Sequence, residues 1–316
     1  MRPLFRYGLV VAACVIVGVF LYALIMYLPG RSVELATSVV ADGAGTFTTL
    51  LKNIFAPRDV SLVVFGKPGG SHQGADLADA IIVVHYSPDR NALTLISIPR
   101  DLWIADDRRQ FKINEVFRLS TPSAVINTIE QITGLSIRGY VTVDLSVVER
   151  FIDDLGGVDV TLRAPAVDWV SGYTMLPGLH HLSGEDAVWL MRNRFSSEGD
   201  FFREKNQHAI ARDVLLKFRA LDRDAQLALM NAYIFDTSLL SDAHIDADTI
   251  FSYLLNAHLE TLSVRSVVLD FSTKLLVNSS VLLPGVGTTT RVSVLLPTQG
   301  FERYDAMRAY IQQMLK

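Results

Sequence analysis

Short apolar runs set the fold class of this 316-residue chain. Residues 61–66, 80–86 and 92–98 are apolar and rich in β-branched side chains, and Gly, Pro, Asp or Asn bounds each run. Runs of this length and near-continuous hydrophobicity are typical of strands that are buried on both faces of a sheet. We therefore expect central strands that are covered by other elements on both sides.

Helical segments alternate with these runs. Residues 121–134 begin with Thr-Pro and end with Gly, which mark the cap, the first position and the end of a helix. Residues 140–162 read as strand, helix and strand, a unit that joins parallel strands. Further strands are predicted at 263–271 and 290–296, and a terminal amphipathic helix at 300–316. The sequence predicts the α/β class, as a three-layer α/β/α sandwich with a central mixed, largely parallel sheet.

An uncharged apolar stretch of 21 residues runs from Gly8 to Leu28. At ~1.5 Å per residue, such a helix spans roughly 31 Å, which matches the hydrocarbon core of a bilayer. Arg2 and Arg6 precede it, so the amino terminus is expected in the cytoplasm. A cleaved signal peptide is the alternative, but its apolar region is usually only about 7 to 15 residues long. We interpret the stretch as one transmembrane helix, a signal anchor in the cell membrane.

Four parts are expected on this basis. Residues 1–7 form a short cytoplasmic tail, 8–28 the anchor, 29–58 a juxtamembrane helix or stalk, and 59–316 an extracytoplasmic domain. The net charge is only -4, from 29 basic and 33 acidic residues, so no global field favours nucleic acid and any anion site must be local. The single cysteine, Cys14, excludes disulfides and cysteine-based metal sites within the chain.

The densest polar segment is WLMRNRFSSEGDFFREKNQHAI, residues 189–210. Ser183 and Asp186 predict the start of a helix that reaches into this segment. Arg192 and Arg194 would diverge by about 200° on a continuous helix. The Ser-Ser-Glu-Gly that follows predicts that the helix ends between them, which lets the two arginines converge.

A second helix is predicted to begin at Asp200 as its cap. Arg203 and Gln207 then share one face of this helix near its free N–H groups. Helix N-termini and guanidinium groups are common phosphate-binding devices, so this region is a candidate anion site. The alternative is a set of exposed ion pairs worth only ~0 to 1 kcal/mol each. Their acidic partners would be Glu185, Asp186, Glu198 and Glu204.

Two charged residues directly follow another predicted strand. Residues 96–104, ISIPRDLWI, place Arg100 and Asp101 directly after a proline at a strand end. Further motifs follow in order: KIN at 112–114, LGGVDV at 155–160, LSGEDAVWLMRNR at 182–194 and GDFFREKNQ at 199–207. On these motifs together the chain, from about Ser61 to its end, resembles the LytR-CpsA-Psr family. Members of that family are membrane-anchored extracytoplasmic bacterial proteins that transfer glycopolymers from a polyprenyl-pyrophosphate carrier to the cell wall.

The resemblance implies roles for particular residues. It matches diphosphate-binding positions to five residues: Arg100, Arg192, Arg194, Arg203 and Gln207. Arg100, Arg192 and Arg194 are then also catalytic, because they stabilise charge on the leaving phosphate, and Asp101 orients Arg100 or serves as base. Because like charges repel in an empty site, we expect alanine replacements of these arginines to leave folding intact or slightly improved.

A magnesium ion is also implied, with Asp79 as one of its ligands. Three positions depart from the family pattern: Lys67-Pro68 stands where a first metal aspartate is expected, and Leu77 and Asn206 stand where arginines are usual. Asp76 is a candidate replacement ligand, and Lys67 a candidate substitute for the metal's positive charge. His180 and His181 are interpreted as solvated loop residues, because no third ligand lies at a suitable spacing.

The function implied by the resemblance is that of a phosphotransferase. Its partners are a polyprenyl-pyrophosphate-linked glycan, peptidoglycan or another wall acceptor, and the cytoplasmic membrane, with no nucleic acid. Two alternatives stay open: a non-catalytic regulator of wall synthesis that binds polyprenyl phosphates, and a lipid pyrophosphatase that uses water as acceptor.

Overall fold

The computed structural model describes six stretches of the chain, residues 59–68, 74–195, 198–234, 240–245, 261–284 and 289–316. The predicted anchor and stalk, residues 8–58, lie outside these described residues. Among the helices within them, none has the length and hydropathy that a membrane span requires.

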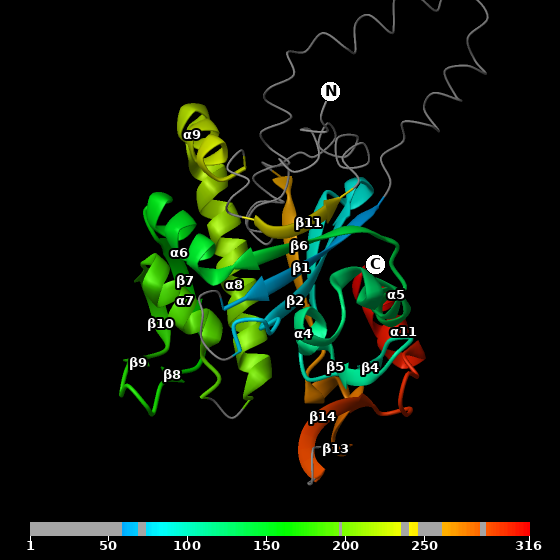
Figure 1. Cartoon of the computed structure of the whole chain (residues 1–316). Coiled ribbons are helices and arrows are strands. Elements are labelled where there is room, and N and C mark those ends of the chain that lie inside the picture. Colours follow the sequence, from blue (N-terminus) through cyan, green and yellow to red (C-terminus); the bar gives the residue numbers. More distant parts are fainter. Residues whose placement is uncertain (1–58, 69–73, 196–197, 235–239, 246–260, 285–288) are drawn as a thin grey trace, which may run out of the picture.

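A six-stranded sheet forms the centre of the fold (Figure 1), in the order β11-β6-β1-β2-β3-β12. Its strands are β1 (Val60–Lys67), β2 (Ala80–Ser87), β3 (Ala92–Ser97), β6 (Ile137–Asp144), β11 (Leu240–Ile245) and β12 (Ser263–Val268). Only β1 with β6 and β3 with β12 pair in parallel, and the three other pairings are antiparallel. The sheet is therefore mixed, as predicted, but the prediction that it is largely parallel was wrong. The short 88–91 link between β2 and β3 shows why, since a parallel crossover needs about a dozen residues or more.

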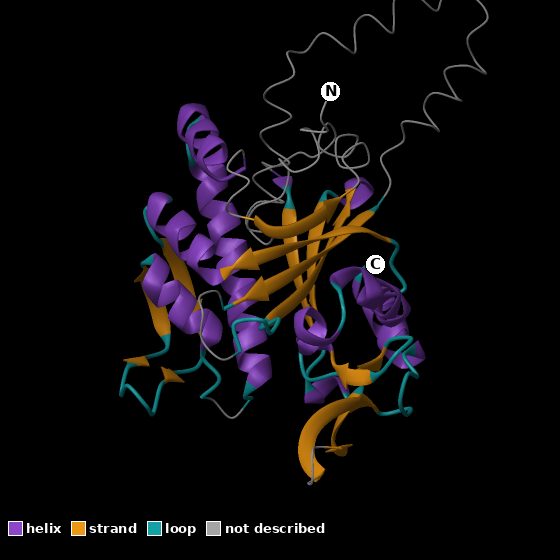
Figure 2. Cartoon of the chain, viewed as in Figure 1, coloured by secondary structure: helices purple, strands orange, loops and turns teal. Residues whose placement is uncertain are grey.

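Helices cover both faces of this sheet (Figure 2), as the three-layer prediction requires. The helices are α4 (Val116–Leu119), α5 (Pro122–Thr133), α6 (Leu145–Asp154), α7 (Gly184–Arg192), α8 (Asp200–Ala220), α9 (Arg223–Ile234) and α11 (Asp305–Met314). Along β1, Leu62 and Val64 join a core cluster with residues of α6, α7 and α8. The alternate residues Val63 and Phe65 join a second cluster with α4, α5 and α11. Strand residues of both parities are apolar because both faces of β1 are buried.

Capping residues mark the helix ends, as the sequence predicted. Thr121 Oγ1 accepts a hydrogen bond from Ala124 N at the start of α5, and Gly134 ends that helix with a φ of 70°. Ser183 Oγ accepts from Asp186 N at the start of α7. These caps satisfy backbone groups that would otherwise lack partners at the helix termini.

Two-stranded ribbons surround the main sheet. They comprise β4 (Trp103–Ala105) with β5 (Gln110–Lys112), β7 (Val158–Leu162) with β10 (Gly178–Leu182), β8 (Ala166–Val167) with β9 (Thr174–Met175), and β13 (Leu276–Pro284) with β14 (Thr289–Pro297). His180 and His181 lie in β10 and not in a loop, and His181 Nδ1 is 2.7 Å from Asp159 Oδ1 on β7. The β13–β14 ribbon is fastened to the body of the fold where Leu295 N donates to Asp101 O at 2.9 Å.

Candidate functional site

Asn114 holds together the two loops that begin the site. Asp79 directly precedes β2, and its backbone N–H donates to Gly66 O at the end of β1. Arg100 follows the end of β3. Asn114, in the KIN motif, accepts from Ala78 N at 2.8 Å and donates from its own N–H to Arg100 O at 3.1 Å. This backbone bridge sets Asp79 and Arg100 side by side although they are far from one another in the sequence.

Helix α8 supplies the other half of the site. Gly199, with a φ of 56°, stands at the cap position, and no side-chain cap is present there. Asp200 is the first helical residue and not the cap that the sequence predicted. Its carboxylate instead receives two arginine side chains, one from the loop after β3 and one from α8 itself. An acidic side chain in the first turn also suits the helix dipole.

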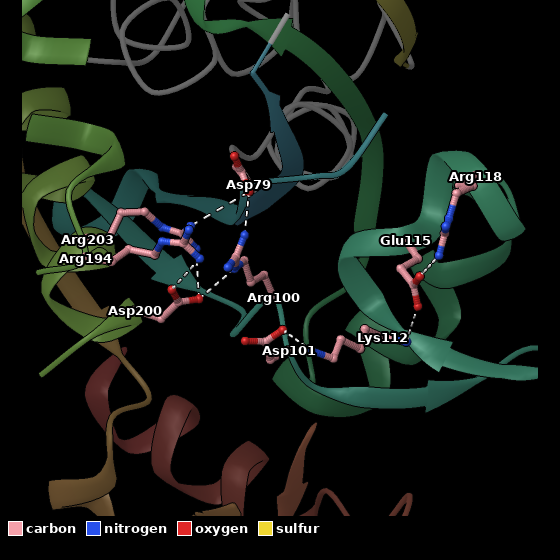
Figure 3. A network of polar contacts seen from close by, with 9 residues as sticks. All are labelled: Asp79, Arg100, Asp101, Lys112, Glu115, Arg118, Arg194, Asp200 and Arg203. Carbon is pink, nitrogen blue, oxygen red and sulfur yellow. Dashed lines mark hydrogen bonds and ion pairs between the residues drawn. The ribbon is translucent and has the colours of Figure 1, made fainter. Parts of the chain in front are cut away.

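Arginines and aspartates converge at this point (Figure 3). Arg100 donates from Nε to Asp200 Oδ2 at 2.7 Å and from Nη1 to Asp79 Oδ1 at 2.6 Å. Arg203 Nη2 lies 3.1 Å from Asp200 Oδ2, and its Nη1 lies 3.8 Å from Asp79 Oδ1. Arg194 reaches Asp200 Oδ1 more loosely, at 3.9 Å. We call these five residues the arginine cluster: Asp79, Arg100, Arg194, Asp200 and Arg203.

The arginines of the cluster differ in how far their side chains are buried. The side chain of Arg203 is 3% exposed, that of Arg100 13%, and that of Arg194 52%. The Nε atom of Arg203 is buried without a hydrogen-bond partner, so the most enclosed guanidinium keeps an unused donor. Arg194, at the open side, is the cation best able to meet an incoming group.

Charge within the cluster is nearly balanced. Burial acts to lower the pKa of Arg100, but Asp200, Asp101 and Asp79 raise it on balance. Burial lowers the pKa of Arg203, and the positive charge of Arg100 adds to that lowering. Both guanidiniums stay protonated because arginine side chains are not deprotonated in proteins. Three arginines against two aspartates leave one positive charge for an anionic ligand.

The structure leads us to revise, for Arg100 and Arg203, the expectation that alanine replacements leave folding intact. It assumed that arginines repel one another in an empty site. In the structure, Asp79 and Asp200 compensate the two buried guanidiniums, so deletion of one leaves carboxylates without a full set of partners. The partners, Asp79 and Asp200, also differ from the four acidic residues that the surface alternative named.

Asp101 lies next to the cluster but outside its ion pairs. Its Oδ1 atom accepts from Lys112 Nζ at 2.8 Å, while its side chain remains 30% exposed. The backbone oxygen of Asp101 accepts from Leu295. Asp101 also lines a cavity between the start of α8 and the β13–β14 ribbon. One of its carboxylate oxygens is bound by Lys112.

Arg192 is not brought into the arginine cluster. Helix α7 ends at Arg192, and the buried Asn193 donates from Nδ2 to Val167 O and accepts at Oδ1 from Phe195 N. This fixed turn separates the two arginines. Arg192 lines a different cavity, together with Glu149, Asp168, Glu185 and Trp189.

Gln207 is buried one turn beyond Arg203. Its Nε2 atom donates to Met191 O at 3.1 Å, and the neighbouring Asn206 Nδ2 reaches Leu190 O at 3.5 Å. Both amides donate to carbonyls of the last turn of α7, where Leu190 O also accepts from Asn193 N. Gln207 thus holds α7 against α8, and its Oε1 atom is buried without a partner.

The cluster does not form a preformed magnesium site. Among the described residues, no three metal-binding side chains come together. Asp79 Oδ1 is bound by Arg100, and Lys67 pairs with Asp76 at 3.8 Å. Magnesium favours several oxygen ligands and gives up its water reluctantly, so a lone, arginine-bound carboxylate is a poor site for it.

Comparison with known families agrees with this arrangement of motifs. The model of the LytR_cpsA_psr family matches residues 49–260, which include the arginine cluster. The chain belongs to the LytR-CpsA-Psr family. The family assignment made from the five sequence motifs is thereby confirmed.

Relatives in the family are distant. A polyisoprenyl-teichoic acid–peptidoglycan teichoic acid transferase TagU from Bacillus cereus (strain AH820) is 28% identical over 154 residues, covering 47% of this chain and 50% of that protein. The biofilm regulatory protein A of Streptococcus mutans is 24% identical over 215 residues, covering 59% of this chain and 53% of that protein. This LytR-CpsA-Psr chain spans about half the length of the curated relatives it matches.

Solved structures share the fold. Bacillus subtilis TagV superposes with a TM-score of 0.58 at 19% identity, covering 82% of this chain and 98% of TagV. A structure of TagT bound to LIIa-WTA gives a TM-score of 0.57 at 17% identity, covering 82% and 91% of the two chains. At this identity the likeness establishes the α/β fold of the LytR-CpsA-Psr chain.

Sequence reasoning missed two features of the site. The pairing of Lys112 with Asp101 could have been predicted, because Lys112 is the first residue of the KIN motif. The approach of the β13–β14 ribbon to Asp101 had no local signal, since it depends on a backbone contact between distant segments.

Proposed function

We propose that this LytR-CpsA-Psr protein transfers a glycopolymer from a polyprenyl-diphosphate carrier to a hydroxyl group of the cell wall. The observation that carries the proposal is the convergence of Arg100, Arg194 and Arg203 beside two carboxylates at the end of β3 and the start of α8. The transferase name of its TagU relatives supports the same activity and suggests peptidoglycan as acceptor.

Electrostatics explains what the arginines contribute. Two unit charges 4 Å apart interact by about 4 kcal/mol at an effective dielectric near 20. A diphosphate that meets several fixed guanidiniums is bound, and the negative charge that builds on the leaving phosphate is stabilised. Arg194 is open enough to close onto the ligand, while Arg100 and Arg203 are already fixed by their aspartates.

The proposed transfer needs only the acceptor hydroxyl group and the polyprenyl-diphosphate donor. The oxygen of the acceptor hydroxyl bonds to the phosphorus that carries the glycan, and the bond from that phosphorus to the oxygen of polyprenyl phosphate breaks. The hydroxyl proton passes to a carboxylate, for which Asp101 is better placed than Asp200. One oxygen of Asp101 is held by Lys112, whereas Asp200 is engaged by the three arginines. No step is assigned to magnesium, because the residues do not form a site for it.

The proposed location follows from the sequence. The apolar stretch 8–28 anchors the chain in the cytoplasmic membrane, and the domain from residue 59 onward acts on its outer side. This places the site on the side where wall glycan is exposed. Finding the amino terminus of the mature protein beyond Gly30, or finding the domain inaccessible to external protease in spheroplasts, would contradict the arrangement.

The test uses the purified full-length chain with a radiolabelled polyprenyl-diphosphate glycopolymer and wall glycan. We expect label on the glycan, abolished in Arg100→Ala and Arg203→Ala. Arg308→Ala is the matched control: Arg308 lies on α11, 42% exposed and 3.7 Å from Asp305. Tight lipid binding without turnover identifies a regulator of the kind that the Streptococcus mutans relative's name suggests. Release of labelled glycosyl phosphate without acceptor identifies a pyrophosphatase.

A further inference from the structure

A cavity of about 290 Å³ adjoins the arginine cluster on its carboxylate side. It lies between the first turn of α8 and the β13–β14 ribbon. Asp101 and Asp200 line it at the transfer site, Phe271 lines it from the segment before the ribbon, and Asn278 and Ser293 line it from the two ribbon strands. Asp200 is thus shared between this cavity and the guanidiniums of Arg100 and Arg203.

The ribbon extends this lining into a polar stripe. Asn278 pairs with Leu295 and Ser280 pairs with Ser293, and directly opposed residues of an antiparallel pair lie on the same face. Arg291, opposite Leu282, also lies on this face, and its Nη1 donates to Ser280 Oγ at 3.1 Å. The stripe comprises Asn278, Ser280, Arg291 and Ser293, and it leads from the transfer site along the ribbon.

The ribbon is held in place at its inner end. Leu295 N donates to Asp101 O, and Leu102 forms a parallel β-bridge with Leu295. Because of this fastening, the face that carries Asn278 and Ser293 keeps a fixed relation to the carboxylate of Asp101. A ligand lying on the stripe would therefore have one end at that carboxylate.

The chemistry of the lining selects the class of ligand. Asp101 and Asp200 are hydrogen-bond acceptors when ionised, so they repel a phosphate and receive hydroxyl donors. Phe271 is 45% exposed and stacks edge-on against the buried Phe201 at 5.0 Å, so it offers a fixed apolar surface. Asn278 and Ser293 can both donate and accept. A neutral sugar chain, with hydroxyl groups at its edges and C–H groups on its ring faces, matches all of these groups.

We propose that this cavity and the polar stripe bind the acceptor, a glycan strand that offers an uncharged sugar hydroxyl group to Asp101. The inference rests on the proposed function and adds the acceptor's place to it. Guanidiniums hold the donor diphosphate on one side of Asp200, and the carboxylates hold the attacking hydroxyl on the other. That division suits a displacement in which the entering and leaving oxygens are roughly in line at phosphorus.

The variants that test it are Phe271→Ala and Asn278→Ala. Both side chains are exposed, so neither replacement removes a buried side chain. Val277→Ala is the matched control, since Val277 is 43% exposed and lies on the opposite face of the same strand. Soluble, uncross-linked peptidoglycan glycan strands are titrated into the full-length chain and followed by saturation-transfer NMR. Affinity for polyprenyl diphosphate is measured separately on the same preparations.

We expect each of the two variants to bind the glycan strands about tenfold more weakly than wild type, which corresponds to about 1.4 kcal/mol. Val277→Ala should bind them normally, and all three should keep wild-type affinity for polyprenyl diphosphate. Wild-type protein that does not bind the strands, or variants that bind them as wild type does, would overturn the inference. Variants that lose affinity only for polyprenyl diphosphate would also overturn it, because the cavity would then bind the sugar of the donor. Failure of the proposed function shows itself differently, as wild-type protein that does not bind polyprenyl diphosphate.

Discussion

Replacing Arg100 with alanine should separate the structural role of the arginine cluster from its binding role. Arg100 makes charged hydrogen bonds of 2.7 Å and 2.6 Å to Asp200 and Asp79, with only 13% of its side chain exposed. Hydrogen bonds to charged groups contribute about 1.5 to 3 kcal/mol each. Arg203 remains beside both aspartates, and these are 22% and 23% exposed, so water compensates part of the loss. We therefore expect Arg100→Ala to lower the free energy of unfolding by about 2 to 4 kcal/mol.

Arg194→Ala is the contrasting variant. Arg194 is 52% exposed and lies 3.9 Å from Asp200, so its ion pair contributes about 0 to 1 kcal/mol. For a domain of this size, 1 kcal/mol shifts the melting temperature by roughly 2 to 4 °C. Arg100→Ala should thus melt about 4 to 16 °C below wild type and Arg194→Ala within about 4 °C of it. Both should lose affinity for polyprenyl diphosphate.

Thermal unfolding by circular dichroism and lipid binding by calorimetry, on the same full-length preparations, measure the two quantities. Arg100→Lys is informative as well, because lysine keeps the charge but cannot reach two aspartates with a planar fork. It should recover part of the melting temperature and little of the affinity. Unchanged melting of Arg100→Ala would refute the ion-pair geometry, and normal lipid affinity of Arg194→Ala would refute its place in the binding site.

Three further outcomes follow from other parts of the chain. Glu204 is buried, its Oε2 atom has no hydrogen-bond partner, and burial raises its pKa from 4.5 to about 8. The native state therefore holds a proton that the unfolded chain releases, so stability should fall as pH rises from 4.5 to about 8, and Glu204→Gln should flatten that slope in melting curves. Gly184→Ala would place a Cβ 2.1 Å from Glu149 O and should cost about 3 kcal/mol in denaturant unfolding. Gly172→Ala, which meets no neighbour but has a φ of 76°, should cost only about 1 to 2 kcal/mol. Magnesium should bind the lipid-free chain weakly, because Asp79 is engaged by Arg100, and calorimetry that shows tight binding would contradict this.

Local patterns in the sequence determined the elements of this protein. The buried strands β1, β2 and β3 and the capped helices α5 and α7 were predictable, because apolar periodicity and cap residues act within a few neighbouring positions. Arg100, Arg194 and Arg203 were predicted to be site residues from the resemblance to the family, and the predicted helix ends around Arg194 and Arg203 supported this. Their common location beside Asp79 is what the structure adds.

Tertiary structure decided the rest, because contacts between distant segments leave no pattern in either segment alone. Antiparallel pairing of β1, β2 and β3 follows from loop lengths and packing, and it left only two parallel pairings in the central sheet. The sequence pattern predicts Asp200 as a helix cap. In the structure it is instead the counterion of Arg100 and Arg203, whose guanidinium groups are buried beside it. Asn193 is a local turn residue, yet its hydrogen bond to Val167 fixes the turn between Arg192, which lines a separate cavity, and Arg194, which pairs with Asp200. Asp200 took the role of counterion because charged groups must be paired once the layers of the fold have enclosed them.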